Sequence, residues 1–166
     1  MAAITHQIGL WMNDSKTKHM INRQDGNKVK AIDLMGKKYG KVESFKYLGS
    51  VMTSVNDIEI EVKSKIAVGN KCYHALGPIL KRRSISQSIK SRLYKTIIRP
   101  TVIYGAEKWT VTSEIEKKIL MTWEKEILRK IYGPTKENGQ WRIKTNAELI
   151  TKYISQDILT VIKIRR

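Results

Sequence analysis

The sequence predicts an α+β fold that is mainly α, with a short β element followed by a basic helical bundle. In the segment 1–53, short runs rich in β-forming residues alternate with turn-forming residues. From Asn56 onward, apolar residues recur at spacings of three and four, as they do on one face of an α-helix. A chain of 166 residues, of which 41% are hydrophobic, is long enough to bury a core of its own.

The amino-terminal part is expected to be built from short strands. Residues 3–11 have the pattern of the end of a helix that runs into Gly9. The strands that follow are expected at 16–22, 28–33 and 41–53. Because three short strands form only a marginal unit by themselves, we expect this part to have belonged to a larger sheet.

The first predicted helix begins at Asn56, whose side chain suits the N-cap position, and ends or bends at Gly77-Pro78. Asp57, Glu59 and Glu61 place negative charge on its first turns, where the helix dipole favours it. Its apolar stripe consists of Ile58, Val62, Ile66, Gly69, Tyr73 and Leu76.

A second helix is predicted to start near Ser84 or Ser86 and to bend or break at Pro100, with 101–109 continuing helically. Its expected apolar face consists of Ile89, Leu93 and Ile97. Three cations on another face of this helix lie three and four residues apart: Arg92, Lys95 and Arg99.

The third predicted helix starts at a capping box formed by Ser113 and Glu116 and stops at Gly133-Pro134. Its apolar stripe consists of Ile115, Ile119, Leu120, Trp123, Ile127, Leu128 and Ile131. Asn146 is expected to cap a last helix, which contains Leu149, Tyr153, Ile158 and Val161. Of the aromatic residues, Tyr104, Trp109 and Trp123 are assigned to the core, whereas Trp141 fits either the core or a base-stacking role.

The charge of the chain indicates a polyanionic partner. The formal net charge is +17, from 32 Lys and Arg residues against 15 Asp and Glu residues. No acidic residue lies between Glu61 and Glu107, an interval that contains many cations. A solvated helical face normally mixes both signs, so an interval without counter-charge favours binding of nucleic acid. An anionic membrane is the rival partner, but no apolar run approaches the roughly 18–20 residues that span a bilayer, and no membrane partner is expected.

Metal and thiol chemistry find little support in the sequence. Cys72 is the only cysteine, which excludes a disulfide within the chain and a cysteine-based zinc cluster. His6, His19 and His74 lack metal-ligand spacing and are interpreted as surface or packing residues. No metal or other cofactor is therefore expected for this chain. A single cysteine fits an intracellular compartment.

Several stretches resemble the carboxyl-terminal half of the reverse transcriptase of non-LTR (LINE-type) retrotransposons. GLWMNDSKTKHM (9–20) is similar to motif D, and ESFKYLGS (43–50) to the primer-grip hairpin, motif E. RLYKTIIRPTVIYGAEKWT (92–110) and ILRKIYGP (127–134) look like the thumb and post-thumb helices, as do Trp141-Arg142 and Asn146 to Leu149. The matches follow the family order across nearly the whole chain. The resemblance implies a nuclear location and an RNA-directed DNA polymerase as the parent enzyme.

The chain departs from the family at the catalytic centre. In the family, carboxylates that include an adjacent Asp-Asp pair hold two metal ions, which activate the primer hydroxyl and stabilise the leaving pyrophosphate. This chain has no adjacent carboxylate pair, and its aspartates are scattered: Asp14, Asp25, Asp33, Asp57 and Asp157. Polymerase catalysis by the chain alone is therefore not expected. Mg²⁺ is expected only for the full-length parent enzyme.

The resemblance implies roles for particular residues. Lys16 matches the motif D lysine, which lies near the incoming triphosphate, although it also fits an exposed turn lysine. The primer grip would consist of Phe45, Lys46, Tyr47, Leu48 and Gly49, of which Phe45 and Leu48 are also expected in the core. Cations of the thumb would contact the phosphates of the template–primer duplex: Lys63, Lys71, Lys81, Arg82, Arg83, Arg92, Lys95 and Arg99.

Together these expectations divide the chain into a palm remnant at 1–53, a thumb-like bundle at 54–133 and a post-thumb extension at 134–166. The expected function is sequence-independent binding of an RNA–DNA hybrid or duplex, with the missing fingers and palm portion of a polymerase as a further partner. Two alternatives stay open at this point. The chain is then either an inactive relic of a decayed retroelement or a basic module that binds an acidic protein.

Overall fold

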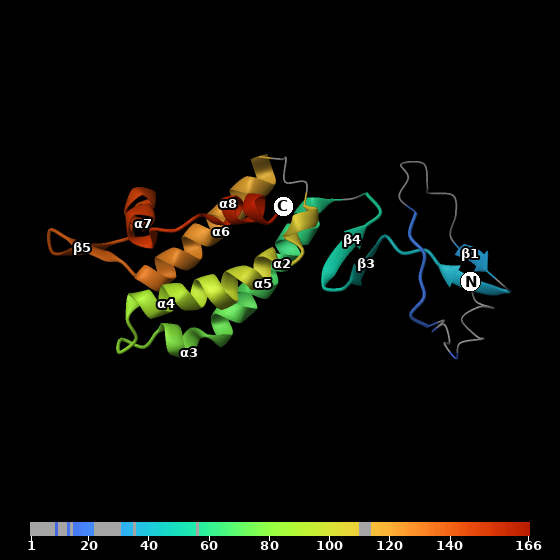
Figure 1. Ribbon diagram of the computed structural model, residues 1–166, viewed down its shortest axis with the longest axis horizontal. Helices are drawn as coiled ribbons and strands as arrows, with labels where there is room; N and C mark the ends of the chain where they lie inside the picture. The colour runs from blue at the N-terminus through green and yellow to red at the C-terminus, as the bar shows by residue number, and fades with distance from the viewer. Residues whose placement is uncertain are drawn as a thin grey trace. The chain divides into compact units, whose positions relative to one another are not determined.

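The structure is a computed structural model that describes residues 9, 13, 15–21, 31–34, 36–55, 57–109 and 114–166. It confirms the predicted α+β, mainly α fold, in which the strands form short antiparallel hairpins (Figure 1). The chain divides into two compact units, Met1–Asp57 and Ile58–Arg166. The segments predicted as the bundle and as the post-thumb extension therefore lie, apart from the first residues of the bundle segment, within one unit.

Unit 1 is built from β-hairpins. Its strands are β1 (Ala31–Leu34), β2 (Lys37–Gly40), β3 (Ser44–Tyr47) and β4 (Ser50–Thr53), which pair as β1 with β2 and β3 with β4. The single strand expected at 41–53 is wrong, because the chain reverses at Leu48 and Gly49. Both residues have positive φ, 48° and 81°, as a two-residue turn of type I′ requires. The strand β2 was not predicted.

The strand expected at 16–22 is not formed by the described residues 15–21. The carbonyl oxygen of Asn13 accepts hydrogen bonds from the backbone N–H groups of Lys16 (3.1 Å) and Thr17 (3.0 Å), which closes a turn there. Only an isolated bridge from His19 to Lys41 follows. The helix end expected at 3–11 lies outside the described residues apart from Gly9, which is in a turn.

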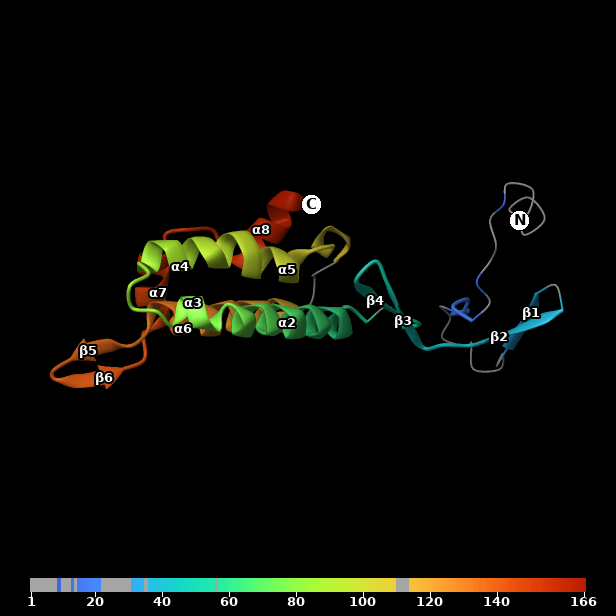
Figure 2. The same cartoon turned by 90° about the horizontal axis from the view of Figure 1, so that it is seen from below.

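Unit 2 is a helical bundle with one small hairpin at its end (Figure 2). Its helical elements are α2 (Ile58–Ala75), α3 (Gly77–Leu80), α4 (Gln87–Leu93), the π-helical turn η2 (Tyr94–Ile98), α5 (Arg99–Ile103), the 3₁₀ turn η3 (Ala106–Lys108), α6 (Glu114–Tyr132), α7 (Asn146–Tyr153) and α8 (Ile158–Arg165). Its strands are β5 (Thr135–Glu137) and β6 (Gln140–Arg142). The helix α2, the α4–η2–α5 segment and α6 run side by side around the core.

The first helix forms as predicted, and its stripe faces the core. Val62 is fully buried, and the stripe contacts α5 and α6. At Gly69 the absence of a side chain is required, because an added Cβ would lie 2.3 Å from Cγ2 of Val102 and 2.9 Å from Cζ2 of Trp123. The predicted stop at Gly77-Pro78 holds, since α2 ends at Ala75 and the proline opens the short helix α3. The predicted cap at Asn56 lies outside the described residues.

The second helix presents a different face to the core from the one predicted. Ile89 and Ile97 are exposed, and only Leu93 of the predicted face packs against the core. The buried residues of this segment are Ser91, Tyr94, Ile98 and Val102. The aliphatic pattern was misleading because Tyr94 can be buried completely when its hydroxyl finds a partner, here Oε1 of Glu124 at 2.8 Å.

Pro100 does not break the helix. It lies in α5, directly after the π-helical turn η2, and the helical path is continuous from Gln87 to Ile103. A wider i→i+5 turn is one way for a helix to accommodate a proline, which lacks an N–H and crowds the preceding turn. Helicity then ends at Tyr104, which is 62% exposed and not in the core as expected.

The third helix forms as predicted and ends at Tyr132; Gly133 follows it, with a φ of +66° that suits a residue just after a helix. Trp109 and Trp123 are buried as predicted, whereas Ile115 at the start of α6 is 60% exposed. The capping residue Ser113 lies outside the described residues. The rest of the predicted stripe of α6 packs into the core or against it: Ile119, Leu120, Ile127, Leu128 and Ile131.

The carboxyl-terminal segment forms two helices and a hairpin where one helix was expected. The hairpin β5–β6 was not predicted, and it turns at Asn138 and Gly139, both with positive φ. The cap of α7 is Thr145 and not Asn146: Thr145 forms a capping box with Glu148. The chain leaves α7 through Ile154, which has φ 40°, before Asp157 caps α8.

Candidate nucleic-acid interface

The strongest candidate interface in unit 2 is a groove of about 580 Å³, here called the basic groove. It lies between the α4–η2 segment, the end of α6 and the end of α7. Its lining residues are Gln87, Ser88, Ser91, Arg92, Lys95, Tyr132, Lys152, Tyr153 and Ile154. None of these lining residues is acidic, so its cations meet no counter-charge from the groove wall.

Helical spacing explains why α4 and η2 bring cations and hydroxyls to one groove. Four residues of this segment are separated from one another by three or four positions, apart from one adjacent pair, which places them on one side of the helix: Ser88, Ser91, Arg92 and Lys95. Arg92 is exposed, while Lys95 is half-buried with its Nζ 5.1 Å from the centre of the Tyr153 ring. This cation–π contact holds the ammonium group at the groove wall.

The opposite wall of the groove comes from α7 and is fixed by hydroxyl hydrogen bonds. The hydroxyl oxygen of Tyr132 lies within hydrogen-bond distance of Oγ of Ser91 (3.2 Å) and of the carbonyl oxygen of Lys152 (3.4 Å). Tyr132 of α6 therefore joins α4 to α7 at the groove, which the exposed Lys152 lines together with Arg92 and Lys95. Burial raises the pKa of Tyr153 to about 12, so its hydroxyl stays neutral at physiological pH.

Arg99 is not in the basic groove and acts inside the protein. Its Nη1 donates to the hydroxyl of Tyr153 at 2.9 Å and to the carbonyl oxygen of Gln156 at 3.0 Å. The guanidinium therefore bonds to the residue before Ile154 and to a residue after it. Ile154 is a β-branched residue in the left-handed region and is 85% exposed. The structure brings Arg92 and Lys95 together as predicted, but it uses Arg99 to hold the α7–α8 connection.

A buried carboxylate fixes the start of α8 against the bundle. Glu124 is 3% exposed and accepts hydrogen bonds from the Tyr94 hydroxyl and from the backbone N–H of Ile158, each at 2.8 Å. Burial raises the pKa of Glu124, and its hydrogen bonds oppose that shift. Burial, together with the nearby charge of Glu124, also raises the pKa of Tyr94 well above its ordinary value. This network connects η2, α6 and α8 under the groove.

The other predicted cations are distributed over unit 2. Lys63 on α2 is exposed and pairs with Glu59 at 2.6 Å, and Lys71 is exposed near the end of the same helix. The predicted cations of the connection from α3 to α4 are all exposed: Lys81, Arg82 and Arg83. None of these five residues lines the basic groove. The connection does lead directly into α4, which supplies the groove with Arg92.

The predicted primer-grip residues form the β3–β4 hairpin of unit 1. The residues from Phe45 to Gly49 cover most of β3 and both turn residues, and the hairpin itself was expected from the resemblance. The expected burial of Phe45 and Leu48 is wrong, because they are 36% and 73% exposed. Among the described residues, their hairpin is a sheet of two strands only. Lys16, in a turn of the same unit, is exposed.

Sequence reasoning found only Arg92 and Lys95 among the nine residues that line the basic groove. Ser88 and Ser91 could have been found, since they lie one helical turn from Arg92 and Lys95. Tyr132 and Lys152 carried no local signal, because their place depends on how α7 folds back onto the bundle.

Two further findings concern the residues that the structure describes. They contain no group of three or more His, Cys, Asp or Glu side chains placed to hold a metal ion. Within the same residues, no helix combines the length and the apolar character needed to cross a bilayer.

Comparison of the chain with models of protein families, with curated proteins and with solved structures found no match.

Proposed function

We propose that this chain is the thumb-containing part of an RNA-directed DNA polymerase of the non-LTR retrotransposon type, and that it binds template–primer duplex without sequence preference. The observation that carries the proposal is the basic groove, where Arg92, Lys95 and Lys152 converge with no acidic residue among the residues that line it. The resemblance of the sequence to the thumb and primer-grip motifs gives the polymerase context.

The chemistry of the groove suits a phosphate backbone. Arg92 can donate two N–H groups to one phosphate, and the ammonium groups of Lys95 and Lys152 supply charge on both sides of it. The hydroxyls of Ser88 and Ser91 offer further donors along the same wall. Such contacts fix the position of a duplex and carry no sequence information. In this proposal, the metal-binding carboxylates belong to a separate fingers and palm portion.

Salt-dependent binding tests the proposal. The triple variant Arg92→Gln, Lys95→Gln, Lys152→Gln removes the groove cations and keeps polar side chains of similar length. Each phosphate contact on B-DNA contributes about 0.9 to the slope of log K against log salt. The triple variant should therefore lower that slope by roughly 2.7. Fluorescence anisotropy with duplex DNA and with an RNA–DNA hybrid measures both slopes.

A matched variant separates the groove from the overall charge. The triple variant Lys118→Gln, Lys163→Gln, Arg165→Gln removes the same charge from exposed positions outside the groove. If both triple variants lose the same affinity, binding depends on the net charge alone, and the relic interpretation is favoured. Binding by the native protein that does not respond to salt would also contradict the proposal, as would a nuclease-resistant complex with an acidic protein.

A further inference from the structure

The hairpin β5–β6 is very short, yet charged side chains fix it firmly to the bundle. Lys144 is 4% exposed, and its Nζ donates to the carbonyl oxygen of Pro134 at 3.0 Å and to Oγ1 of Thr135. On the other side, Arg142 makes two bonds of 2.8 Å to Glu148 of α7. Strands of three residues would not hold such a position by themselves.

Helix α6 supplies a third attachment. Arg129 donates from Nε to the carbonyl oxygen of Lys144 at 3.2 Å and from Nη2 to Oδ1 of Asn146 at 2.7 Å. The base of the hairpin is therefore bonded to α6, to α7 and to its own first strand. A segment that is fixed from three sides presents its outer side chains in a defined geometry.

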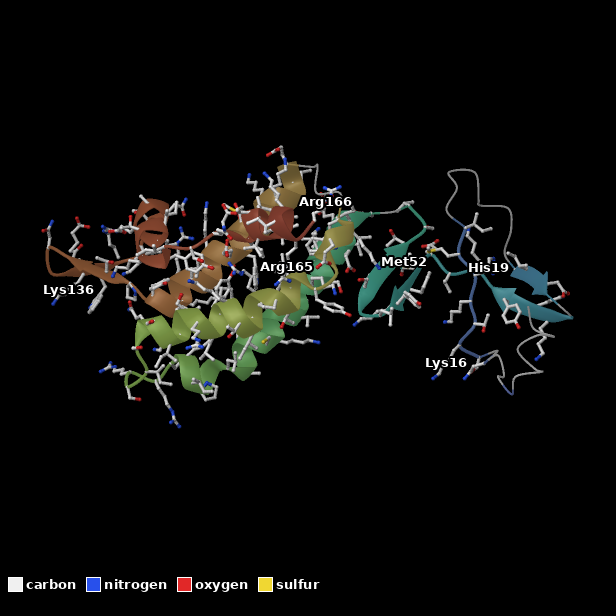
Figure 3. All side chains as sticks on the ribbon, viewed as in Figure 1. Lys16, His19, Met52, Lys136, Arg165 and Arg166 are labelled. Carbon is white, nitrogen blue, oxygen red and sulfur yellow. The ribbon has the colours of Figure 1, made fainter. Side chains whose placement is uncertain are left out.

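What the hairpin presents is an exposed tryptophan beside a lysine. Trp141 is 69% exposed, whereas Trp109 and Trp123 are each 4% exposed. Its partner across the hairpin is Lys136, which is therefore on the same face and which lies on the projecting part of the hairpin (Figure 3). Because side chains alternate along a strand, Trp141 points away from the side on which Arg142 binds α7.

The apolar surface continues beyond the hairpin next to a second cation. Ile143, two residues after Trp141, is 74% exposed and lines a cavity of about 310 Å³ together with Pro134 and Lys130. The aromatic ring of Trp141 and the cation of Lys136 therefore share one face of the hairpin, and an exposed aliphatic side chain follows at its base. This combination is typical of sites that stack bases of an unpaired strand and neutralise its phosphates.

We infer that Trp141 is a stacking platform for an unpaired base of a single-stranded nucleic-acid segment, with Lys136 contacting the adjacent phosphate. The inference rests on the proposed nucleic-acid function and narrows it, since the ligand then has a single-stranded part next to its duplex. A nucleobase fits this surface better than an acidic peptide does, because a peptide would leave the exposed indole face without a flat partner. Stacking tolerates every base, which agrees with binding that does not depend on sequence.

Three substitutions at one position test the stacking. Trp141→Ala and Trp141→Leu remove the ring, and Trp141→Phe keeps an aromatic face. The probe is a short oligothymidylate, compared with an abasic strand that has the same number of phosphates. Loss of one stacked base should weaken oligothymidylate binding roughly 5- to 150-fold in the Ala and Leu variants. The Phe variant should bind nearly as well as the native protein, and no variant should change abasic-strand binding.

Intrinsic fluorescence supplies an independent readout. Oligothymidylate should quench the tryptophan emission of the native protein, and this quenching should be lost in Trp141→Leu. Ile150→Ala is the matched control, since it removes another hydrophobic side chain that is 70% exposed. Equal binding of the Leu variant and the native protein would overturn the inference. An equal loss on the abasic strand, or a Trp141-dependent protein complex that nuclease does not dissolve, would overturn it as well.

Duplex binding by the basic groove and base stacking on Trp141 can each be disproved without the other. Blunt duplex binding should be unchanged by Trp141→Leu, whereas the triple variant of the basic groove should weaken it and lower its salt slope. If duplex binding survives the groove variant while Trp141→Leu loses oligothymidylate binding, the groove proposal is wrong and the stacking platform stands. If only the groove variant has an effect, the stacking platform is wrong.

Discussion

The hairpins β3–β4 and β5–β6 have the same turn geometry and different anchoring. Each turns through two residues of positive φ, Leu48 and Gly49 in the first, Asn138 and Gly139 in the second. In β3–β4 every residue from Ser44 to Gly49 is exposed. In β5–β6 the strands are shorter, but the buried Lys144 follows them directly and binds their base. The comparison teaches that turn residues set the shape of a hairpin, while side-chain bonds at its base decide whether its surface is held in place.

The largest expected difference between the hairpins concerns these bonds at the base. Lys144→Met keeps the length of the side chain and removes its donors, which leaves the carbonyl oxygen of Pro134 and Oγ1 of Thr135 without this partner. Unsatisfied buried groups cost about 1–3 kcal/mol. We expect a loss of stability of that size in urea denaturation. The control Lys46→Met changes an exposed lysine of β3–β4 and should alter stability by less than about 0.5 kcal/mol. Equal effects would mean that the two hairpins are anchored alike.

A smaller difference is expected at the turns themselves. Leu48 carries a side chain in the left-handed region, which glycine occupies without strain and asparagine tolerates. Leu48→Gly should stabilise β3–β4 by about 1 kcal/mol, and Asn138→Leu should destabilise β5–β6 by about the same amount. Amide hydrogen exchange of the strand residues measures both changes. Slower exchange after Asn138→Leu would contradict the argument from turn geometry.

The smallest expected effect is a pH dependence that only β5–β6 shows. Hydrogen bonds from Arg142, with a further one from the backbone of Thr145, lower the pKa of Glu148 to about 2. The pKa of a glutamate in an unfolded chain is about 4.3. A carboxyl group with a lowered pKa adds stability that is present above the unfolded value and is lost as pH falls toward the folded one. The attachment of β6 to α7 should therefore survive at pH 4 and be lost near pH 2.

An NMR titration of the Glu148 carboxyl carbon, with the Trp141 indole as a reporter of hairpin attachment, tests this pH dependence. In Glu148→Gln the indole signal should lose its transition near pH 2. A titration midpoint at the ordinary value of glutamate would show that the pair with Arg142 does not form in solution.

The sequence predicted the long helices because their signals are local. The spacing of Val62, Ile66 and Gly69 and the stop at Gly133-Pro134 each depend on residues within a few turns of one another. The buried face of the α4–η2 segment differs from the prediction, because Tyr94 of η2 is buried through a partner, Glu124, that lies on α6. Local spacing contains no information about such a partner.

The candidate site, like the helices, could be predicted only where the signal is local. Arg92 and Lys95 could be placed on one face from their spacing, and the structure puts both in the basic groove. Arg99 shares their periodicity but binds Tyr153 and Gln156, and that choice depends on where the chain after α7 returns. Lys152 completes the groove for the same long-range reason. The hairpin that carries Trp141 was missed because its strands have only three residues each.

The close approach at Gly69 limits how the helices of unit 2 can move. At this point the backbone of α2 lies against the side chain of Val102 from α5. The ring of Trp123 from α6 lies beside the same glycine. A sideways shift of α5 along α2 would drive Val102 into main-chain atoms, which cannot give way as a side chain can. Val102 belongs to the same continuous helical path as Arg92 and Lys95. The close contact at Gly69 therefore restrains sliding along α2 of the helical path that carries these two cations.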